Sequence, residues 1–196
     1  MKEIVIATQN KGKIAEFKQL FEGLEVRSLL DYPTIPDIVE DGMTFAENAA
    51  KKAETLATYL NRMVIADDSG LQVDALDGRP GVYSARYAGP SKNDIDNMEK
   101  VLRELKDIPS EDRTARFICL IAVASPNQET KIYEGTCEGI ISNEARGTNG
   151  FGYDPIFYVP DLEKTMAQLT AEEKNKRSHR ANALKQLLAH KEEWSS

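Results

Sequence analysis

The sequence has few of the residues that bind zinc or form disulfides. Its 196 residues include two cysteines, Cys119 and Cys137, and two histidines, His179 and His190. Both cysteines lie in strand-like segments and lack CxxC spacing, so reduced core thiols are favoured over a disulfide or a thiol centre. A zinc site of ordinary type is nearly excluded, and any bound metal should be a hard cation held by oxygen atoms.

Positive charge and long apolar runs are also scarce. Lys and Arg total 25 against 32 Asp and Glu, and the formal net charge of −7 should repel polyanions such as DNA and RNA. The longest apolar run, 117–124, is far short of a membrane span, and the start MKEIVIAT enters a strand pattern without a signal-peptide profile. We therefore expect a cytoplasmic protein that binds neither a nucleic-acid polymer nor a membrane.

No linker, repeat or low-complexity segment divides the chain, so we expect one domain over residues 1–196. Hydrophobic spacing predicts strands at about 3–8, 63–66, 71–75, 116–124 and 131–141. It predicts helices at about 14–21, 44–60 and 93–106 and from 170 and 178 onward, with caps at Thr44, Thr170 and Ser178. Because regular βαβ alternation fails in the middle, this order indicates an α/β protein with a mixed sheet.

The turn between the first strand and the first helix has the chemistry of an anion site. It consists of Thr8, Gln9, Asn10, Lys11, Gly12 and Lys13. Backbone N–H groups, a helix N-terminus and two ammonium groups suit phosphate oxygens, although the spacing of a Walker loop is absent and an ordinary surface turn is the alternative. Lys52 on the second helix could add a positive charge, or it could belong with Lys51 to a solvated face.

Two pairs of acids could serve a metal ion. Asp67 and Asp68 follow an apolar strand, at the position where α/β proteins usually place ligands, and an Asx-type turn is the alternative for the sequence DDSG. Adjacent strand residues point in different directions, so the two carboxylates can have different tasks. Glu40 and Asp41 form a second pair in a loop, and both pairs together could supply the carboxylates with which Mg²⁺ bridges substrate phosphates.

Two C-terminal segments could recognise a planar ligand. The stretch RGTNGFGYDPIF offers close backbone approach through its three glycines, a stacking surface, and a carboxylate in Asp154, and the alternative is a glycine-rich loop that packs aromatics such as Tyr153 into the core. Ser178, His179 and Arg180 place donors in the first turn of a helix, where the macrodipole favours acids. Such a local exception indicates a bound anion or an acceptor atom.

The motifs TQNKGK, TFAENAAKKA, IADDSG, PGVYSARYAG, FGYDPIF and EEKNKRSHR together resemble one family, in the family's order and over nearly the whole chain. The sequence is similar to the inosine triphosphate pyrophosphatases, also described as dITP/XTP pyrophosphatases. The resemblance implies a two-lobed α/β fold with helices flanking a mixed central sheet and an active cleft between the lobes, a homodimer, and dependence on Mg²⁺. It implies hydrolysis of non-standard purine nucleoside triphosphates (ITP, dITP, XTP) to the monophosphate and pyrophosphate, which removes them from the nucleotide pool.

The resemblance also implies roles for single residues. Asp68 would be the proton acceptor and a metal ligand, with possible help from Asp67, and Ser69 would touch the substrate. Residues Thr8 to Lys13 and Lys52 would bind the triphosphate. The base pocket and its approach would consist of Phe151, Gly152, Tyr153, Asp154, Lys174, His179 and Arg180. When the segment that ends at Gly42 is aligned with the family, the position of the family's usual metal-binding acid is occupied by Val39. Glu40 takes that role if the alignment of this segment shifts by one residue.

Two alternatives stay open at this stage. A pyrophosphatase of related fold that prefers modified pyrimidine nucleotides would use the same phosphate chemistry with a different base pocket. A nucleotide sensor would bind without turnover, which Asp67, Asp68 and the two lysines make less favourable. His179 and Arg180 would donate hydrogen bonds to a 6-oxo group, whereas the 6-amino group of adenine would face them with another donor.

Overall fold

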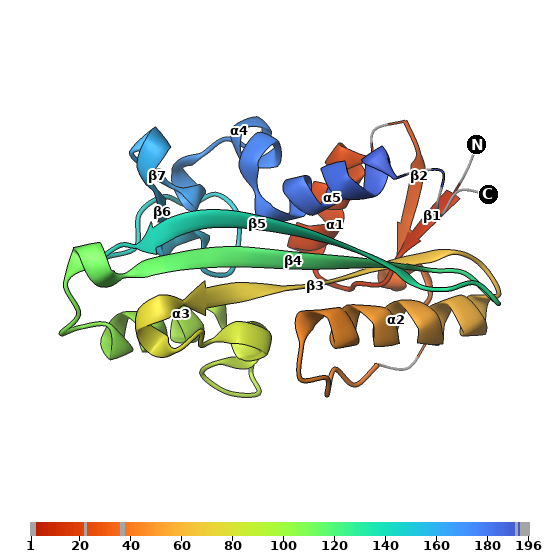
Figure 1. Ribbon diagram of the computed structural model, residues 1–196, viewed down its shortest axis with the longest axis horizontal. Helices are drawn as coiled ribbons and strands as arrows, with labels where there is room; N and C mark the ends of the chain where they lie inside the picture. The colour runs from red at the N-terminus through yellow and green to blue at the C-terminus, as the bar shows by residue number, and fades with distance from the viewer. Residues whose placement is uncertain (1–2, 22, 36–37, 191, 193–196) are drawn as a thin grey trace. The chain divides into compact units, whose positions relative to one another are not determined.

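The computed structural model of the chain describes residues 3–21, 23–35, 38–190 and 192 (Figure 1). The chain forms two compact units. Unit 1 comprises Met1–Asp68, Cys119–Gly135 and Ala183–Ser196, and unit 2 comprises Ser69–Ile118 and Thr136–Asn182. Because the chain crosses between the units four times, each unit is assembled from segments that are distant in the sequence.

Seven strands form a mixed sheet in the order β2-β1-β3-β4-β5-β6-β7. Their bounds are β1 Glu3–Ile6, β2 Glu25–Ser28, β3 Val64–Val73, β4 Thr114–Ala124, β5 Lys131–Ile141, β6 Phe157–Val159 and β7 Lys164–Thr165. In unit 1, β1 pairs in parallel with β2 and β3, whereas in unit 2 β6 pairs antiparallel with β5 and β7. The predicted α/β fold with a mixed sheet and flanking helices is therefore confirmed.

Of the five α-helices in the described residues, three begin at the predicted caps, whereas the first helix begins at Lys11, within the predicted turn TQNKGK, with Asn10 as its cap. Their bounds are α1 Lys11–Leu20, α2 Phe45–Leu60, α3 Asp94–Glu104, α4 Ala171–Arg177 and α5 His179–Ala189. Thr44 and Thr170 each form a capping box, and Ser178 Oγ accepts from Ala181 N at 3.1 Å where α5 begins. These side chains satisfy N–H groups that have no partner inside the helix. None of the helices in the described part of the chain has both the length and the apolar character needed to cross a membrane.

In unit 1, strand alternation decides which helix covers which face. Ile4, Ile6 and Ile65 share one face and form a core cluster with Phe17 of α1 and Leu184 of α5. Helix α2 lies on the other side of the strands (Figure 1). Because side chains alternate along a strand, neighbouring residues of β3 in this unit face different helices.

Unit 2 has its own apolar core around Leu71, Val101, Phe117 and Phe157. The rings of Phe117 and Phe157 lie 4.3 Å apart between centroids. The hydrophobic spacing that predicts a helix at about 93–106 does not match burial at the first turn of α3, because Ile95 is 61% exposed while Val101 is fully buried. Only the C-terminal part of α3 thus contributes to this core.

The predicted break between two strands at DDSG is also wrong. Strand β3 runs without interruption from Val64 to Val73, so Asp67 and Asp68 lie inside a strand and not in an Asx turn. Since β3 lies between β1 and β4 in the sheet, pairing on both sides overrides the turn propensity of Asp, Ser and Gly. The two carboxylates consequently point to opposite faces of the sheet.

Candidate active site

The turn after β1 leads into a helix start suited to an anion. Asn10 caps α1, and its Oδ1 accepts from Lys13 N at 3.1 Å, while Asn10 N donates to Thr8 Oγ1 at 3.1 Å. The side chains of Gln9 and Lys11 are exposed. The first turn of α1 contains no acidic side chain, so its positive dipole end and two ammonium groups are available to phosphate oxygens.

Lys13 is held by the first of the two adjacent acids. Its Nζ lies 2.9 Å from Oδ2 of Asp67, whose side chain is fully buried. A buried carboxylate is tolerated when a cation compensates its charge, so this pair fixes Lys13 beside β3 on the α1 side of the sheet. The predicted role of Asp67 as a metal ligand stays a prediction.

The opposite face of β3 meets two polar side chains of α2. Lys52 Nζ donates to Asp67 O at 2.7 Å and lies 2.6 Å from Glu40 Oε1. One turn earlier on the same helix face, Asn48 Nδ2 donates to Asp68 Oδ2 at 2.9 Å. Lys52 is buried, so the solvated-face alternative for this residue is wrong. That description fits Lys51, which pairs with Asp41 at the surface.

We call Lys13, Glu40, Lys52, Asp67 and Asp68 the acidic cluster. Burial disfavours the charge on Lys52, but Glu40, Asp67 and Asp68 more than compensate, and the pKa of Lys52 is raised above its ordinary value. Burial likewise opposes ionisation of Glu40, yet the charge and hydrogen bond of Lys52, with Lys13, lower the pKa of Glu40. Both groups are therefore charged near neutral pH.

Asp68 differs from its neighbours in the acidic cluster. Burial raises its pKa, and repulsion by Glu40 adds to this effect, so that together they outweigh Lys52, Lys13 and the Asn48 hydrogen bond. The net pKa of Asp68 lies above its ordinary value. A carboxylate with a raised pKa binds a proton more strongly, which is the property that a general base requires.

The donors of the acidic cluster fit a hard cation. Glu40 and Asp68 offer carboxylate oxygens, and their charges influence each other. Over the residues that the structure describes, no group of three or more His, Cys, Asp or Glu is arranged for a metal. Mg²⁺ needs only one or two protein carboxylates, because it keeps water ligands and takes oxygens from phosphates. Val39 is 67% exposed, whereas Glu40 contacts Lys52, so Glu40 is the acid directed toward this cluster.

In unit 2, Asp154 organises the glycine-rich loop. Its Oδ2 accepts from Phe151 N at 3.0 Å and from Lys174 Nζ at 2.7 Å. Gly150 has φ +75°, and a Cβ there would lie 2.0 Å from Asp154 Oδ2. Only glycine suits both this conformation and this contact, so the loop is ordered around the buried carboxylate.

Cationic and aromatic groups surround Phe151. Lys174 Nζ lies 4.7 Å and Arg180 Cζ 6.0 Å from the centroid of its ring. Arg180 is 1% exposed, and its Nη2 donates to Ser69 Oγ at 3.3 Å. The His179 ring stacks on Phe117 at 4.8 Å between centroids. We call Phe151, Asp154, Lys174, His179 and Arg180 the aromatic cluster, whose flat ring and donors suit a planar ligand with acceptor atoms.

Tyr153 supports this loop from the core. Its ring belongs to the core of unit 2, as the core-packing alternative predicted, and its hydroxyl donates to Ser84 O at 2.7 Å. Burial raises the pKa of Tyr153, so the hydroxyl remains a donor at neutral pH. Gly152 N donates to Asp94 Oδ2 at 2.8 Å. The predicted contacts of Gly152 and Tyr153 with a ligand stay predictions.

Sequence reasoning missed three residues that hold these clusters. Asn48 could have been found, because it lies four residues before Lys52 on the same face of α2. Asp94 has the features of an ordinary acid in the first turn of a helix, and Phe117 those of an ordinary strand residue. Only the fold shows that Asp94 accepts from Gly152 N and that Phe117 stacks on His179.

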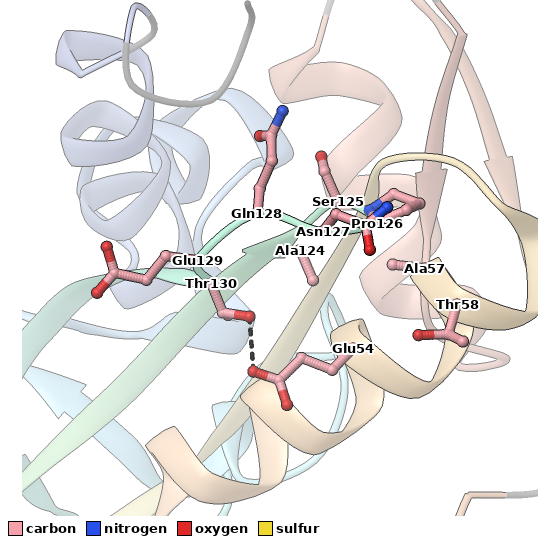
Figure 2. Close-up of a pocket in the computed structure, with 10 residues that line it drawn as sticks. All are labelled: Glu54, Ala57, Thr58, Ala124, Ser125, Pro126, Asn127, Gln128, Glu129 and Thr130. Atoms are coloured by element: carbon pink, nitrogen blue, oxygen red, sulfur yellow. Dashed lines mark hydrogen bonds between the residues drawn. The ribbon is translucent and has the colours of Figure 1, made fainter.

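A separate pocket of about 370 Å³ lies in unit 1 (Figure 2). Three residues of α2, Glu54, Ala57 and Thr58, line it together with the stretch 124–130 at the turn between β4 and β5. Thr130 Oγ1 donates to Glu54 Oε1 at 2.6 Å across it (Figure 2). Its ten lining residues include none of the predicted site residues, so this pocket is separate from the acidic cluster.

Known proteins match the chain over nearly its full length. The family model described as the Ham1 family matches residues 4–190. A dITP/XTP pyrophosphatase of Halalkalibacterium halodurans is 64% identical over 189 residues, which are 95% of this chain and 97% of that protein. The Bacillus subtilis protein of the same name is 60% identical over 95% of this chain and 96% of its own length.

Solved structures match the fold as well. The Ham1 protein of Staphylococcus aureus superimposes with a TM-score of 0.87 at 52% identity, covering 97% of this chain and 98% of that chain. The structure titled nucleoside-triphosphatase / dITP/XTP pyrophosphatase from Mycobacterium abscessus gives a TM-score of 0.77 at 42% identity, covering 95% and 99%. Both structures thus resemble this chain in sequence as well as in fold, over nearly its whole length.

Proposed function

The chain belongs to the Ham1 family, and on that premise we propose that it hydrolyses non-standard purine nucleoside triphosphates to the monophosphate and pyrophosphate. ITP, dITP and XTP are the substrates, and their removal keeps the nucleotide pool free of deaminated purines. The observation that carries the proposal is the buried Asp68, whose pKa is raised beside two lysines and a second acid. We treat residues 1–196 as a single pyrophosphatase domain.

The acidic cluster binds the triphosphate end. Residues Thr8 to Lys13 offer N–H groups and ammonium groups, and Lys52 adds a charge from α2. Lys13 contacts Asp67 and Lys52 contacts Glu40, and these contacts hold both ammonium groups in place. Charge that builds on the departing pyrophosphate is then neutralised without reorganisation, which is the main source of catalysis in phosphoryl transfer.

Glu40 and Asp68 would hold a Mg²⁺ ion, which would supply charge neutralisation at the phosphate oxygens. Asp68 takes a proton from the attacking water, and the water oxygen bonds to the α-phosphorus. The bond between the α-phosphorus and its bridging oxygen breaks, and pyrophosphate leaves with the electron pair. A positioned base of this kind typically contributes about 10² to 10⁴-fold in rate.

The aromatic cluster recognises the base. Phe151 offers a face for stacking, and Lys174, His179 and Arg180 offer donors. A guanidinium donates to a 6-oxo group and cannot accept from a 6-amino group, so hypoxanthine and xanthine satisfy these donors and adenine leaves them unpaired. Sites built on such hydrogen bonds discriminate strongly, because the wrong ligand leaves buried polar groups of the site without hydrogen-bond partners. Ser69, which accepts from Arg180, touches the substrate at the start of unit 2.

A pyrophosphate-release assay tests this proposal against its alternatives. We expect release from ITP, dITP and XTP with Mg²⁺, little release from ATP, and no release after EDTA treatment. A preference for modified pyrimidine triphosphates would show that the protein is instead a pyrophosphatase for modified pyrimidine nucleotides. Binding of ITP without any release would make the protein a sensor. We also propose that the protein is a cytoplasmic homodimer, for which light scattering should give about twice the 21.9 kDa of the chain.

A further inference from the structure

Asn48 lies between the loop that carries Glu40 and the strand that carries Asp68. It is 1% exposed, and both ends of its side-chain amide have partners. Nδ2 donates to Asp68 Oδ2 at 2.9 Å, and Oδ1 accepts from Gly42 N at 2.8 Å. A backbone N–H can only donate and an ionised carboxylate can only accept, so the amide has one orientation. It thereby connects the two acids to a single point of α2.

The loop approaches Asn48 closely. A Cβ at Gly42 would lie 2.6 Å from Asn48 Oδ1 and 2.9 Å from Glu47 Cβ, so the absence of a side chain permits this contact. Glu47 fastens the same loop, because its Oε2 accepts from Met43 N at 2.7 Å. The segment that carries Glu40 is therefore docked on the first turn of α2, and Glu40 reaches Lys52 one turn further along the helix.

Apart from Asn48 and Lys52, the buried residues of α2 are apolar. Phe45, Ala49, Ala53 and Leu56 are buried on α2. A buried amide is costly unless its hydrogen bonds are satisfied, and a small apolar residue would fill this position without that cost. Here both hydrogen bonds go to elements of the acidic cluster, one to the loop of Glu40 and one to Asp68 itself. Asn48 thus has a task beyond packing.

We propose that Asn48 is a positioning residue, which orients the Asp68 carboxylate and fixes the Glu40 loop relative to it; this rests on the proposed function of Asp68 as the base. Asn48 acts only through Asp68 and the loop, and it does not contact the substrate.

Two variants separate positioning from packing. Asn48→Ala removes both hydrogen bonds, whereas Asn48→Asp keeps the shape and the acceptor for Gly42 N but faces Asp68 with an oxygen. Leu56→Ala is the matched control, because Leu56 is buried on the same helix outside both clusters and its loss creates only a cavity. All proteins are assayed with ITP well below their Tm.

We expect both Asn48 variants to lose about 10 to 100-fold in kcat, the range typical of residues that orient a ligand or base. KM for ITP should change less than about threefold, because the phosphate-binding lysines are untouched. Leu56→Ala should retain the wild-type kcat. In an Asp68→Ala background, Asn48→Ala should cause no further loss, since residues that act as a unit are not additive. An additive loss, or an equal loss in Leu56→Ala, would overturn the proposal.

A second measurement does not depend on activity. The wild type, Asn48→Ala, Asp68→Ala and the double variant are unfolded in urea without metal. The coupling free energy between the two sites is calculated from their four free energies of unfolding. We expect a coupling clearly above the experimental error, and a coupling within that error would overturn the positioning role. If the wild-type protein released no pyrophosphate from ITP, the proposed function would fail instead, whatever the coupling.

Discussion

Asp67 and Asp68 are adjacent in the chain, yet the pleat of β3 gives them different surroundings. Asp67 is fully buried against Lys13, which compensates its charge. Asp68 meets Asn48 of α2, and burial leaves its pKa above the ordinary value. A single strand therefore provides one carboxylate that holds Lys13 and one carboxylate with a raised pKa, the property that the proposed base requires.

Asp68→Asn tests the assignment of the base. The change keeps the shape of the side chain and removes the proton acceptor, so kcat for ITP should fall by about 10² or more. Triphosphate binding and the circular dichroism spectrum should be largely unchanged. Retention of more than about a tenth of the wild-type rate would show that another group accepts the proton.

The same variant should be more stable than the wild type at neutral pH. The pKa of Asp68 is raised in the folded state, so its contribution to stability is fully present below the unfolded pKa and is lost as pH rises through the folded pKa. Asn at this position has no charge to desolvate. We expect Asp68→Asn, in EDTA, to have the higher Tm at neutral pH and the difference to shrink on acidification. A lower Tm at neutral pH would contradict the direction of the shift.

Lys13 and Arg180 should have different effects on selectivity. Lys13 contacts Asp67 in the acidic cluster, and its proposed ligand is phosphate, which every triphosphate shares, so Lys13→Ala should depress ITP and ATP hydrolysis in similar proportion. Arg180→Ala should lose about one to two decades in kcat/KM for ITP, the effect of one charged hydrogen bond, and so narrow the preference over ATP. An unchanged ratio of ITP to ATP kcat/KM in Arg180→Ala would show that Arg180 has a structural role alone. Lys13→Ala leaves the buried carboxylate of Asp67 without this ion pair, which destabilises the protein. The variant must therefore be assayed below its Tm.

At the scale of elements, the glycine-rich loop depends on Gly150. Gly150→Ala imposes both a left-handed conformation at φ +75° and a clash with Asp154. Displacement of Asp154 would release Phe151 N and Lys174, so we expect a lower Tm and a raised KM for ITP. Gly78→Ala is the control, because Gly78 has φ +81° but open space around its Cβ. It should cost about 1 to 3 kcal/mol of backbone strain and leave KM unchanged. Equal KM values in the two variants would contradict the role of this loop.

The sequence predicts helices and strands well where local signals, such as a capping box, are strong. The Thr44 capping box and the extent of α2 were predictable, because they depend on neighbouring residues. The mixed sheet was predictable from the order of the elements along the chain. The continuous strand through DDSG was not, since pairing with strands distant in sequence overrides turn propensity. The burial of Lys52 and its contact with Glu40 likewise depend on the fold, because two adjacent lysines have the same local sequence.

At the scale of the molecule, the two clusters lie in different units. Unit 1 contains the acidic cluster, for which we propose phosphate binding, and unit 2 contains the aromatic cluster, for which we propose base recognition. Substitutions in the acidic cluster should therefore affect the hydrolysis of all triphosphates alike, and those around Phe151 should change the ratios of activity between triphosphates. The formal net charge of −7 is compatible with this function, because a few lysines and arginines in each cluster reverse the local sign for a single nucleotide.

The most direct test of the central claim is hydrolysis of ITP in ¹⁸O-labelled water with Mg²⁺, followed by mass spectrometry of the products. If Asp68 activates water for attack on the α-phosphorus, the products are IMP that carries the label and unlabelled pyrophosphate. Formation of IDP with orthophosphate, or appearance of the label in pyrophosphate, would contradict this account.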